Sequence, residues 1–391
     1  MAVEEELAET PPATKAFGGL FRSITTRSQA SGMTTGLFTV ASSLAAVGIA
    51  LAICAALLAV TGKDPWAAYS KIIETGKSSD KLLEMLKRAT PLLISATAVA
   101  IGFKMNLFNI GIEGQYLFAA LMASAIGTQV SLPAPIHILF ILLIAMVAGA
   151  AWASIAAILK VTRNVHEVIS TIMLNYIALA FIQWLFENWF RDNSLQLNIK
   201  TKKLPASGHM PDLVSGKLGG MFLVALFVVF LYWVIVFKSR FGFRLRASGL
   251  NPGAARTAGI DAKRMIVVTM LISGGIAGLI AMQSVLGEIG SYGPNATPTG
   301  FGFAGITVAL LGRHHPLGII TAAMLFAFLD STSAQLQLAN IPSSIVTLMQ
   351  AVIVLTVVIV NEATIRWLNK RTSERTAERL TAPNATAGVP A

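Results

Sequence analysis

This sequence of 391 residues has one cysteine and few charged side chains, and both shortages restrict what it can be. Cys54 lies inside an apolar run, so a disulfide within the chain and a cysteine-based metal site are both excluded. Charged residues make up 13% of the chain and hydrophobic residues 54%, with a mean hydropathy of +0.68. A water-soluble domain of ordinary composition is less apolar than this. We therefore expect a membrane protein.

Sequence signatures of catalysis and of nucleotide binding are also missing. The stretch "TGKSS" resembles the end of a phosphate-binding loop, but Lys71 stands where that loop requires its first glycine. No Gly-x-Ser-x-Gly nucleophile motif occurs, and no carboxylate is spaced to complete a metal site with a histidine. The five histidines are His137, His166, His209, His314 and His315. We predict a protein that is not an enzyme and that binds no ATP, metal or other cofactor.

Apolar runs of membrane-spanning length recur along the chain. A helix needs about 20 residues to cross a hydrocarbon layer of about 30 Å. This criterion predicts an all-α, polytopic membrane protein with about ten transmembrane helices. The expected spans are 37–62, 89–103, 114–136, 135–159, 166–190, 221–237, 265–286, 301–312, 317–329 and 344–360. Whether the short runs 301–312 and 317–329 cross the membrane or turn back is left open.

The positive charge is concentrated in a few connections. The net charge is +11, residues 238–264 hold seven basic residues against Asp261 alone, and a further basic group lies in the tail from Arg366. Basic connections of this kind face the cytoplasm. With ten crossings, both termini are then cytoplasmic, and residues 63–88 and 191–217 lie outside. Nucleic acid is not an expected partner.

The chain divides by composition into one membrane domain and two polar ends. We expect residues 1–36 and 368–391 to be disordered cytoplasmic segments and 37–367 to form the membrane domain. Two stretches, "FNIGIEGQYLFAALMASAIG" and "GFGFAGITVALLGRHHPLG", each place a glycine-rich break before a short apolar run. This weak echo is consistent with two structural repeats that carry re-entrant or broken helices.

The connection "RLRASGLNPGAARTAGIDAKR", residues 244–264, predicts a short helix. Asn251 can cap it, Pro252 suits its first position, and Gly259 can end it. The result is a small-residue helix in a basic cytoplasmic loop. A loop that merely fixes the topology through its charges remains an equal alternative.

The polar stretch "NLFNIGIEGQYLF", residues 106–118, interrupts two apolar runs. Amide and carboxyl side chains at membrane depth are costly, so they normally face a bundle interior or a water-filled path. Asn106, Asn109, Glu113 and Gln115 meet this condition if the backbone breaks near the glycines. The alternative is an ordinary cytoplasmic turn, with Lys104 marking the interface.

A second polar stripe lies in "HEVISTIMLNYI", residues 166–177. Glu167, Thr171 and Asn175 recur every four residues and share one helix face, with Ser170 beside them. Such a stripe either lines a pathway for an uncharged polar solute or bonds neighbouring helices. We assign the helix-bonding role to Thr171 and Ser170 and predict a pathway role for Asn175.

Together, "NLFNIGIEGQ", "HEVISTIMLNYIA", the 244–264 connection and "GFAGITVALLGRHHPLG" resemble a known family. They look like the permease subunits of bacterial ATP-binding-cassette (ABC) importers of the branched-chain amino acid and ribose superfamily, in the branch serving nucleosides or simple sugars. The four motifs occur in the family's order over residues 37–367, nearly the whole expected membrane domain. Each motif alone is weak, and their combination is specific.

The resemblance implies a function and partners. It implies a permease subunit that forms the solute pathway, with cytoplasmic ATPase subunits, a second permease subunit and an external or periplasmic solute-binding protein, in a bacterial plasma membrane. The family's coupling helix, which docks on the ATPase, corresponds here to Gly249, Asn251, Pro252, Ala254, Ala255 and Gly259.

Further alternatives remain at this point. They are a branched-chain amino acid permease, an ion-coupled secondary transporter and a membrane enzyme. The predicted solute pathway consists of Asn106, Asn109, Glu113, Gln115 and Asn175. Neither the solute nor the choice between a homodimer and a heterodimer of permeases follows from the sequence.

Overall fold

Helices make up most of the computed structural model, which describes residues 48–194, 199–214, 216–294, 297–338 and 341–381. The chain divides into two units, Trp66–Thr347 on one side and Met1–Pro65 with Leu348–Ala391 on the other. The described helices of the second unit are Gly48–Val60 and the greater part of α14 (Ser343–Thr381). All the side chains considered below as functional belong to the unit Trp66–Thr347.

The bounds of the elements in this unit follow the apolar runs closely in some places and depart from them in others. The α-helices are α3 (Pro65–Lys77), α4 (Ser79–Phe103), α5 (Ile112–Gly127), α6 (Ala134–Arg163), α7 (Glu167–Leu185), α8 (Met221–Trp233), α9 (Arg240–Leu250), α10 (Pro252–Thr257), α11 (Ala262–Gly278), α12 (Phe301–Leu311) and α13 (Pro316–Leu338). Short π-helical or 3₁₀ segments are η1 (Phe186–Phe190), η2 (Ala206–Gly208), η3 (Val234–Lys238) and η4 (Ser284–Glu288). Strands β1 (Asp212–Val214) and β2 (Leu218–Gly219) form an antiparallel pair.

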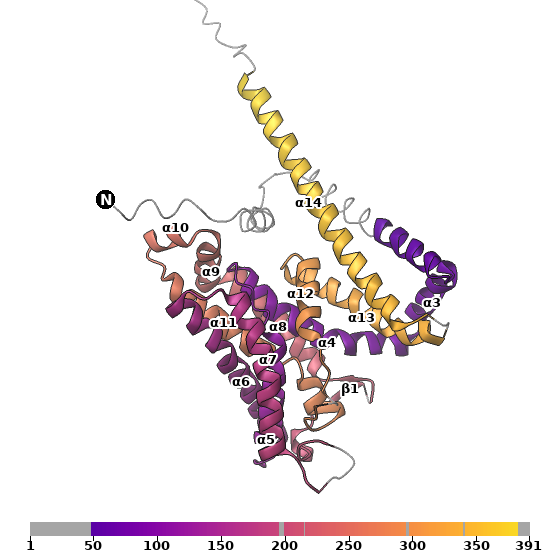
Figure 1. The fold of residues 1–391 in the computed structure, drawn as a ribbon, viewed down its shortest axis with the longest axis vertical. Helices are drawn as coiled ribbons and strands as arrows, with labels where there is room; N and C mark the ends of the chain where they lie inside the picture. The colour runs from indigo at the N-terminus through magenta and orange to yellow at the C-terminus, as the bar shows by residue number, and fades with distance from the viewer. Residues whose placement is uncertain (1–47, 195–198, 215, 295–296, 339–340, 382–391) are drawn as a thin grey trace, which may run out of the picture. The chain divides into compact units, whose positions relative to one another are not determined.

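Helices α5, α6, α7 and α11 pack together into a bundle (Figure 1). The closest approach is between α6 and α11, which run antiparallel with Gly149 opposite Gly274 and Gly278. A Cβ added at Gly149 would collide with the carbonyl oxygen of Gly274, and one at Gly278 with the carbonyl oxygen of Ala145. Small residues at such positions let two helix backbones approach, which is how helices associate in lipid.

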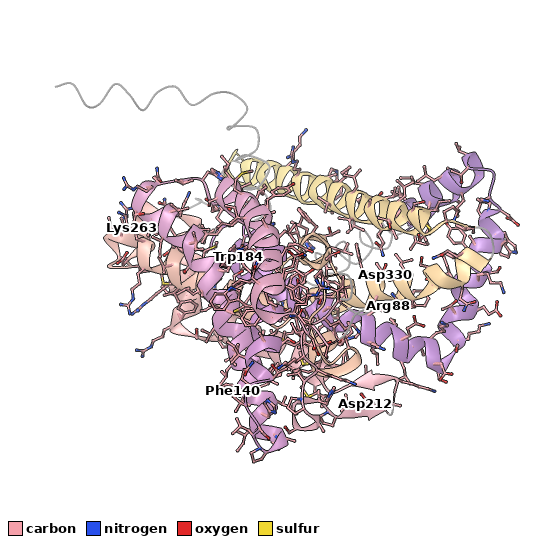
Figure 2. The ribbon with its side chains drawn as sticks, turned by 60° about the horizontal axis from the view of Figure 1, so that its bottom comes forward. Arg88, Phe140, Trp184, Asp212, Lys263 and Asp330 are labelled. Carbon is pink, nitrogen blue, oxygen red and sulfur yellow. The ribbon has the colours of Figure 1, made fainter. Side chains whose placement is uncertain are left out.

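The bundle has two distinct ends. Lys263 at the start of α11 and Phe140 near the start of α6 lie at opposite ends of it (Figure 2). We name these the α10 end, where α9 and α10 lie, and the hairpin end, where the β1–β2 hairpin lies. The hairpin is joined to the first turn of α4 by Lys217, whose Nζ lies 2.7 Å from the Oδ1 of Asp80. At the hairpin end His137 is buried, with one ring nitrogen 2.8 Å from the Oγ of Ser207 and the other 2.9 Å from the carbonyl oxygen of Gly127.

The described residues contain six helices that are long and apolar enough to cross a membrane, compared with the ten crossings expected. They are Ser79–Phe103, Ala134–Arg163, Glu167–Phe190, Met221–Lys238, Pro316–Gln337 and Ser343–Val360. The chain is thus a mostly helical membrane protein, and the count of ten is not confirmed.

Four expected spans differ from the structure. Span 114–136 is wrong because α5 ends at Gly127 and residues 134–136 already belong to α6. Span 265–286 is interrupted after Gly278, where a turn leads to the π-helical segment η4. Run 317–329 is part of the longer α13, whereas run 301–312 forms the 11-residue α12, which is shorter than a span. Apolar composition alone did not separate long helices from short ones joined by a glycine-rich segment.

The structure describes only part of the two polar ends that the sequence predicts. Helix α14 continues to Thr381, so the prediction of a disordered tail from residue 368 is wrong for 368–381. Residues 1–36 and 382–391 lie outside the described part of the chain, and the domain boundaries stay a prediction.

Candidate functional site

The polar stretch 106–118 is a break between two helices of the bundle. Helix α4 ends at Phe103 and α5 begins at Ile112, and the intervening backbone turns at Asn106, which has a φ of 61° and an exposed side chain. Asparagine tolerates this left-handed conformation better than most residues. Of the predicted pathway residues, Asn106 therefore shapes the turn. Asn109 lies farther along the break, and Asn175 lies on α7. Glu113 and Gln115 lie in the first turn of α5.

Asn109 and Gln115 form a buried amide pair in this break. Asn109 Nδ2 donates to Gln115 Oε1, and Gln115 Nε2 donates to Asn109 Oδ1, each at 2.9 Å. Asn109 Nδ2 also donates to Ser273 Oγ on α11, and that hydroxyl donates to the carbonyl oxygen of Ala98 on α4. Buried amides are stable only when hydrogen-bonded, so this network fixes the break against α4 and α11.

Asn175 on α7 supplies hydrogen-bond partners to backbone groups on both sides of the start of α5. Its Oδ1 accepts from the N–H of Gly114, and its Nδ2 donates to the carbonyl oxygen of Ile110, both at 2.9 Å. One amide thus satisfies a donor and an acceptor that the broken helix leaves over.

The neighbouring hydroxyls on α7 do not bond another helix. Thr171 and Ser170 donate to the carbonyl oxygen of Glu167 within α7, so the helix-bonding role expected of them is wrong. A short hydroxyl on a helix reaches its own preceding turn more easily than it reaches a neighbour.

Glu113 connects the start of α5 to the start of α12. Its Oε1 accepts from the N–H of Gly300 at 2.6 Å, and its Oε2 accepts from the N–H of Gly302 at 2.8 Å. The hydroxyl of Tyr116 also donates to Oε1, at 2.7 Å. The first N–H groups of a helix have no partner within it and favour a negative charge. The Glu113 carboxylate therefore closes the N-terminus of α12.

Helix α12 lies directly against α4. Ser95 Oγ donates to the carbonyl oxygen of Phe301 at 2.7 Å, and a Cβ added at Gly305 would collide with the Ser95 side chain. At the other end of α12, the ring of His314 packs on Phe103 with centroids 4.9 Å apart. Ser95 precedes Phe103 by eight residues, which is about 12 Å of helix. The N-terminus of α12 and Glu113 therefore lie away from the α10 end of the bundle.

The turn at the C-terminal end of α12 is tightly held. The hydroxyl of Tyr232 on α8 donates to the carbonyl oxygen of His314 at 2.7 Å. Burial, together with the nearby charge of Lys104, lowers the pKa of the His314 imidazole to about 3. This imidazole is therefore neutral at physiological pH.

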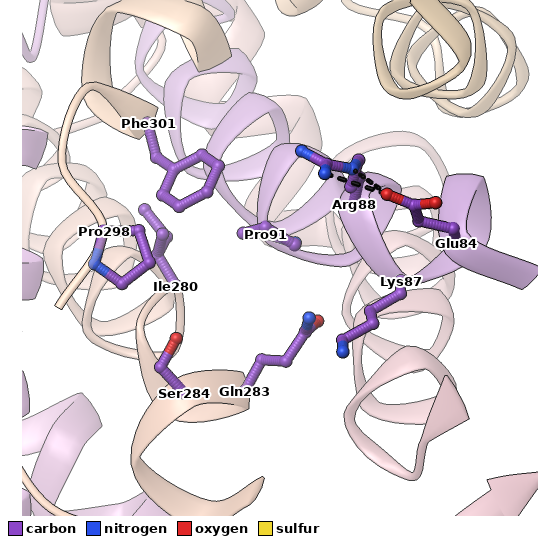
Figure 3. Close-up of a pocket in the computed structure, with 9 residues that line it drawn as sticks. All are labelled: Glu84, Lys87, Arg88, Pro91, Ile280, Gln283, Ser284, Pro298 and Phe301. Atoms are coloured by element: carbon purple, nitrogen blue, oxygen red, sulfur yellow. Dashed lines mark hydrogen bonds and ion pairs between the residues drawn. The ribbon is translucent and has the colours of Figure 1, made fainter. Parts of the chain in front are cut away.

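A cavity of about 290 Å³ opens beside the N-terminus of α12. It lies between the first half of α4, the segment after α11 and the residues that enter α12 (Figure 3). Its lining consists of Glu84, Lys87, Arg88, Pro91, Ile280, Gln283, Ser284, Pro298 and Phe301. Glu84 is paired with Arg88 at 2.9 Å and with Lys81 at 2.8 Å, so its charge is compensated by neighbouring cations.

None of the five predicted pathway residues lines this cavity, but one of them supports its wall. Glu113 holds the N-terminus of α12, and it also holds Tyr116, whose ring lies 6.4 Å from the ring of Phe301. The sequence analysis missed Phe301, Gln283 and Ser284 as cavity residues. The signal that could have found them was the glycine- and proline-rich stretch before α12, which interrupts an apolar region and must approach another part of the fold.

The short helix expected in the 244–264 connection is confirmed as α10. Asn251 Oδ1 accepts from the N–H groups of Gly253 and Ala254, Pro252 occupies the first position, and Gly259 follows with a φ of 75°. Ala255 is buried, whereas Pro252 and Ala254 are exposed. Helix α10 therefore presents a smooth face with little side-chain bulk.

Helix α9 fastens α10 to the break between α4 and α5. A Cβ added at Gly249 would lie 2.7 Å from both the carbonyl oxygen of Lys104 and the Cα of Met105. Thr269 on α11 donates to the Sδ of Met105 at 3.2 Å. Met105, near the start of the break, is therefore packed between α9 and α11.

These features define a class: a polytopic helical membrane protein with broken helices that meet beside a cavity. A short exposed helix, α10, lies at one end of its bundle. Residues 81–360 match the family model described as "Branched-chain amino acid transport system / permease component". The chain belongs to this permease family, which confirms the resemblance found in the sequence.

Individual relatives cover most of the chain. The guanosine ABC transporter permease protein NupP of Bacillus subtilis is 37% identical over 70% of this chain and 79% of its own length. The nucleoside ABC transporter permease protein NupB of Lactococcus lactis is 31% identical over 77% of this chain and 85% of its own. The glucose ABC transporter permease protein TsgB13 of Haloferax volcanii is 32% identical over 78% of this chain and 83% of its own.

Proposed function

We propose that the chain is the membrane-spanning permease subunit of an ATP-driven importer for nucleosides or simple sugars, and that it forms the solute pathway. The observation that carries this proposal is its similarity to permeases of guanosine, nucleoside and glucose transporters over most of their length. The relatives favour this solute class over branched-chain amino acids and favour an ATP-driven importer over an ion-coupled secondary transporter. ATP hydrolysis then belongs to a separate subunit.

The proposed partners follow from α10. Two cytoplasmic ATPase subunits dock on the segment from Gly249 to Gly259, one on each of two permease subunits. Its exposed small residues support this role, because a partner surface can approach the backbone closely there. A solute-binding protein delivers the solute to the outward connections, including residues 191–217. The membrane is a bacterial plasma membrane, crossed about ten times, with both termini cytoplasmic.

The coupling is a movement of packed helices and involves no covalent chemistry in this subunit. ATP binding to the partner displaces α10, and Gly249 passes the movement to Met105. The hydrogen bonds of Asn109, Gln115 and Asn175 keep the break rigid between Met105 and α5. With Asn106 and Glu113, these residues stay the predicted pathway set, and their contacts support a role in positioning the pathway wall.

A pull-down of the tagged protein, with nucleoside uptake followed in parallel, tests the proposal. Ala254→Arg places a bulky charge on the exposed face of α10, and Thr162→Arg makes a comparable change on an exposed residue of α6. We expect Ala254→Arg to lose both the co-purifying ATPase and uptake, and Thr162→Arg to keep both. Uptake by the wild-type protein in vesicles that contain no ATPase would overturn the importer assignment in favour of a secondary transporter.

A further inference from the structure

We propose that the cavity beside α12 is the solute-contact site of this subunit, and that its lining fits a nucleoside, with the base against Phe301 and the ribose toward Gln283 and Ser284. The inference rests on the proposed function and narrows its solute class. Nothing in the family match or in the relatives assigns a role to these residues.

The size of the cavity limits the solute. Its volume of about 290 Å³ lies at the lower end of the range of small-molecule sites, roughly 300–1,000 Å³. This suits one nucleoside or one monosaccharide and excludes an oligosaccharide. Pro298 and Arg88 are exposed and mark the rim, whereas Pro91 and Ile280 are buried at its wall.

One side of the cavity is apolar and carries an aromatic ring. Pro91, Ile280 and Pro298 surround the ring of Phe301 (Figure 3). A purine or pyrimidine base has two flat faces, and either face can stack on such a ring whatever substituents the base carries. A monosaccharide has no comparable flat surface, so this side of the cavity favours a solute that carries a base.

The other side of the cavity is polar, and Lys87 lines it beside Gln283 (Figure 3). Gln283 offers an amide and Ser284 a hydroxyl, and both lie across the cavity from Phe301 (Figure 3). Glu84 is already held by Arg88 and Lys81. The amide and the hydroxyl both donate and accept hydrogen bonds, which matches the hydroxyl groups of ribose.

The position of Phe301 is fixed by the break described above. Its carbonyl oxygen accepts from Ser95, and its ring packs near that of Tyr116, which in turn donates to Glu113. The residue that would stack on the base is thus the first residue of a short helix held at its N-terminus. A positioned ring of this kind loses little conformational freedom on binding, which favours affinity.

The test is equilibrium binding of radiolabelled guanosine and of radiolabelled D-glucose to the purified complex of permease and ATPase, without the solute-binding protein. Three variants are compared with the wild type. Phe301→Leu removes the ring and keeps an apolar side chain, and Phe301→Tyr keeps the ring. Phe303→Leu makes the same change two residues away, where the side chain is 59% exposed and does not line the cavity.

We expect the wild type to bind guanosine more tightly than D-glucose. Phe301→Leu should raise the Kd for guanosine about tenfold, and Phe301→Tyr and Phe303→Leu should stay within about twofold of the wild type. Equal effects of Phe301→Leu and Phe303→Leu, or no effect of either, would overturn the assignment of the cavity. Wild-type protein that binds D-glucose and not guanosine would overturn the nucleoside assignment.

Uptake by the full transporter, measured in parallel, distinguishes a failure of the cavity assignment from a failure of the proposed function. Uptake of guanosine without any measurable binding to the permease and ATPase complex would overturn the cavity site and leave the proposed function standing. Failure of the full transporter to move nucleosides and sugars alike would overturn the proposed function itself.

Discussion

The breaks that precede α5 and α12 look alike in the sequence and are built differently. Before α5, neutral amides of Asn109, Gln115 and Asn175 bond to each other and to the backbone. Before α12, the backbone N–H groups of Gly300 and Gly302 bind the carboxylate of Glu113. The first break is buried in the bundle, and the second borders the cavity. We call the break before α5 the fixed joint, because its amides hold it in place. The break before α12 instead forms a wall of the proposed solute site.

The largest effect is expected from removing the connection between the two breaks. Glu113→Ala leaves the N–H groups of Gly300 and Gly302 without their acceptor, and the hydroxyl of Tyr116 keeps only its bond to the carbonyl oxygen of Pro298. We expect a stability loss of about 3 kcal/mol and a fall in nucleoside uptake of at least tenfold. Glu113→Gln keeps one acceptor oxygen and should be intermediate in both. The measurements are thermal unfolding of the purified complex and uptake in proteoliposomes. A Glu113→Ala protein with normal uptake would show that α12 needs no such anchor.

The second prediction concerns the close contact between α12 and α4, which a larger side chain at position 305 should disrupt. Gly305→Val places a side chain where Ser95 already lies, and the overpacking should cost about 2 kcal/mol. Gly48→Val is the control, because a Cβ there meets nothing within 4 Å and Gly48 does not line the cavity. We expect Gly305→Val to weaken guanosine binding to the permease and ATPase complex more than Gly48→Val does. Equal binding by both variants would contradict a role for the α4 contact in shaping the cavity.

The third prediction concerns a substitution that disrupts the fixed joint before α5 and leaves the break before α12 unchanged. Asn109→Leu leaves the Gln115 amide without its side-chain partner and removes one donor to the Ser273 hydroxyl, which keeps its bond to the carbonyl oxygen of Ala98, and should cost about 1–2 kcal/mol. Because the two amides bond each other, the double variant with Gln115→Leu should cost less than the sum of the single variants. The ratio of guanosine to glucose uptake should stay unchanged in all three. A shift in this ratio would mean that the amide pair touches the solute, as the sequence analysis predicted.

The smallest effect concerns the opposite end of α12. The pKa of His314 is about 3 in the folded protein, below the unfolded value of about 6.5. The unfolded chain therefore takes up a proton as the pH falls below about 6.5 while the folded chain does not, so this residue lowers stability toward acid pH. Between pH 7 and pH 6 we expect a loss of about 0.7 kcal/mol, which His314→Leu should remove. An identical pH dependence of thermal unfolding in both proteins would contradict this.

The sequence predicted the elements whose cause is local. Apolar runs located α6 and α8 well, because a long apolar run that no glycine-rich stretch interrupts forms one helix. The capped helix α10 was predicted residue by residue, because Asn251, Pro252 and Gly259 act on neighbouring backbone groups. The glycines around Glu113 indicated a break for the same reason.

The cavity could not be predicted, because its residues come from segments far apart in the sequence. Arg88 on α4 and Phe301 on α12 are brought together by a close helix contact that Gly305 permits. The partner of Glu113 was likewise hidden, since backbone N–H groups have no sequence signature. The number of crossings is not confirmed for a related reason, because short helices joined inside the bundle have the same composition as spanning ones.

Thiol protection measures the central claim most directly, because Cys54 is the one cysteine of the chain. In a Cys54→Ala background, a cysteine is placed either at Gln283, in the cavity, or at Gln115, in the fixed joint. The permease and ATPase complex is treated with a water-soluble thiol reagent with and without guanosine. The account predicts that Gln283→Cys is labelled and that guanosine protects it, whereas Gln115→Cys is not labelled. Labelling of Gln115→Cys that guanosine prevents, with no protection at position 283, would contradict the account and place the solute at the break before α5.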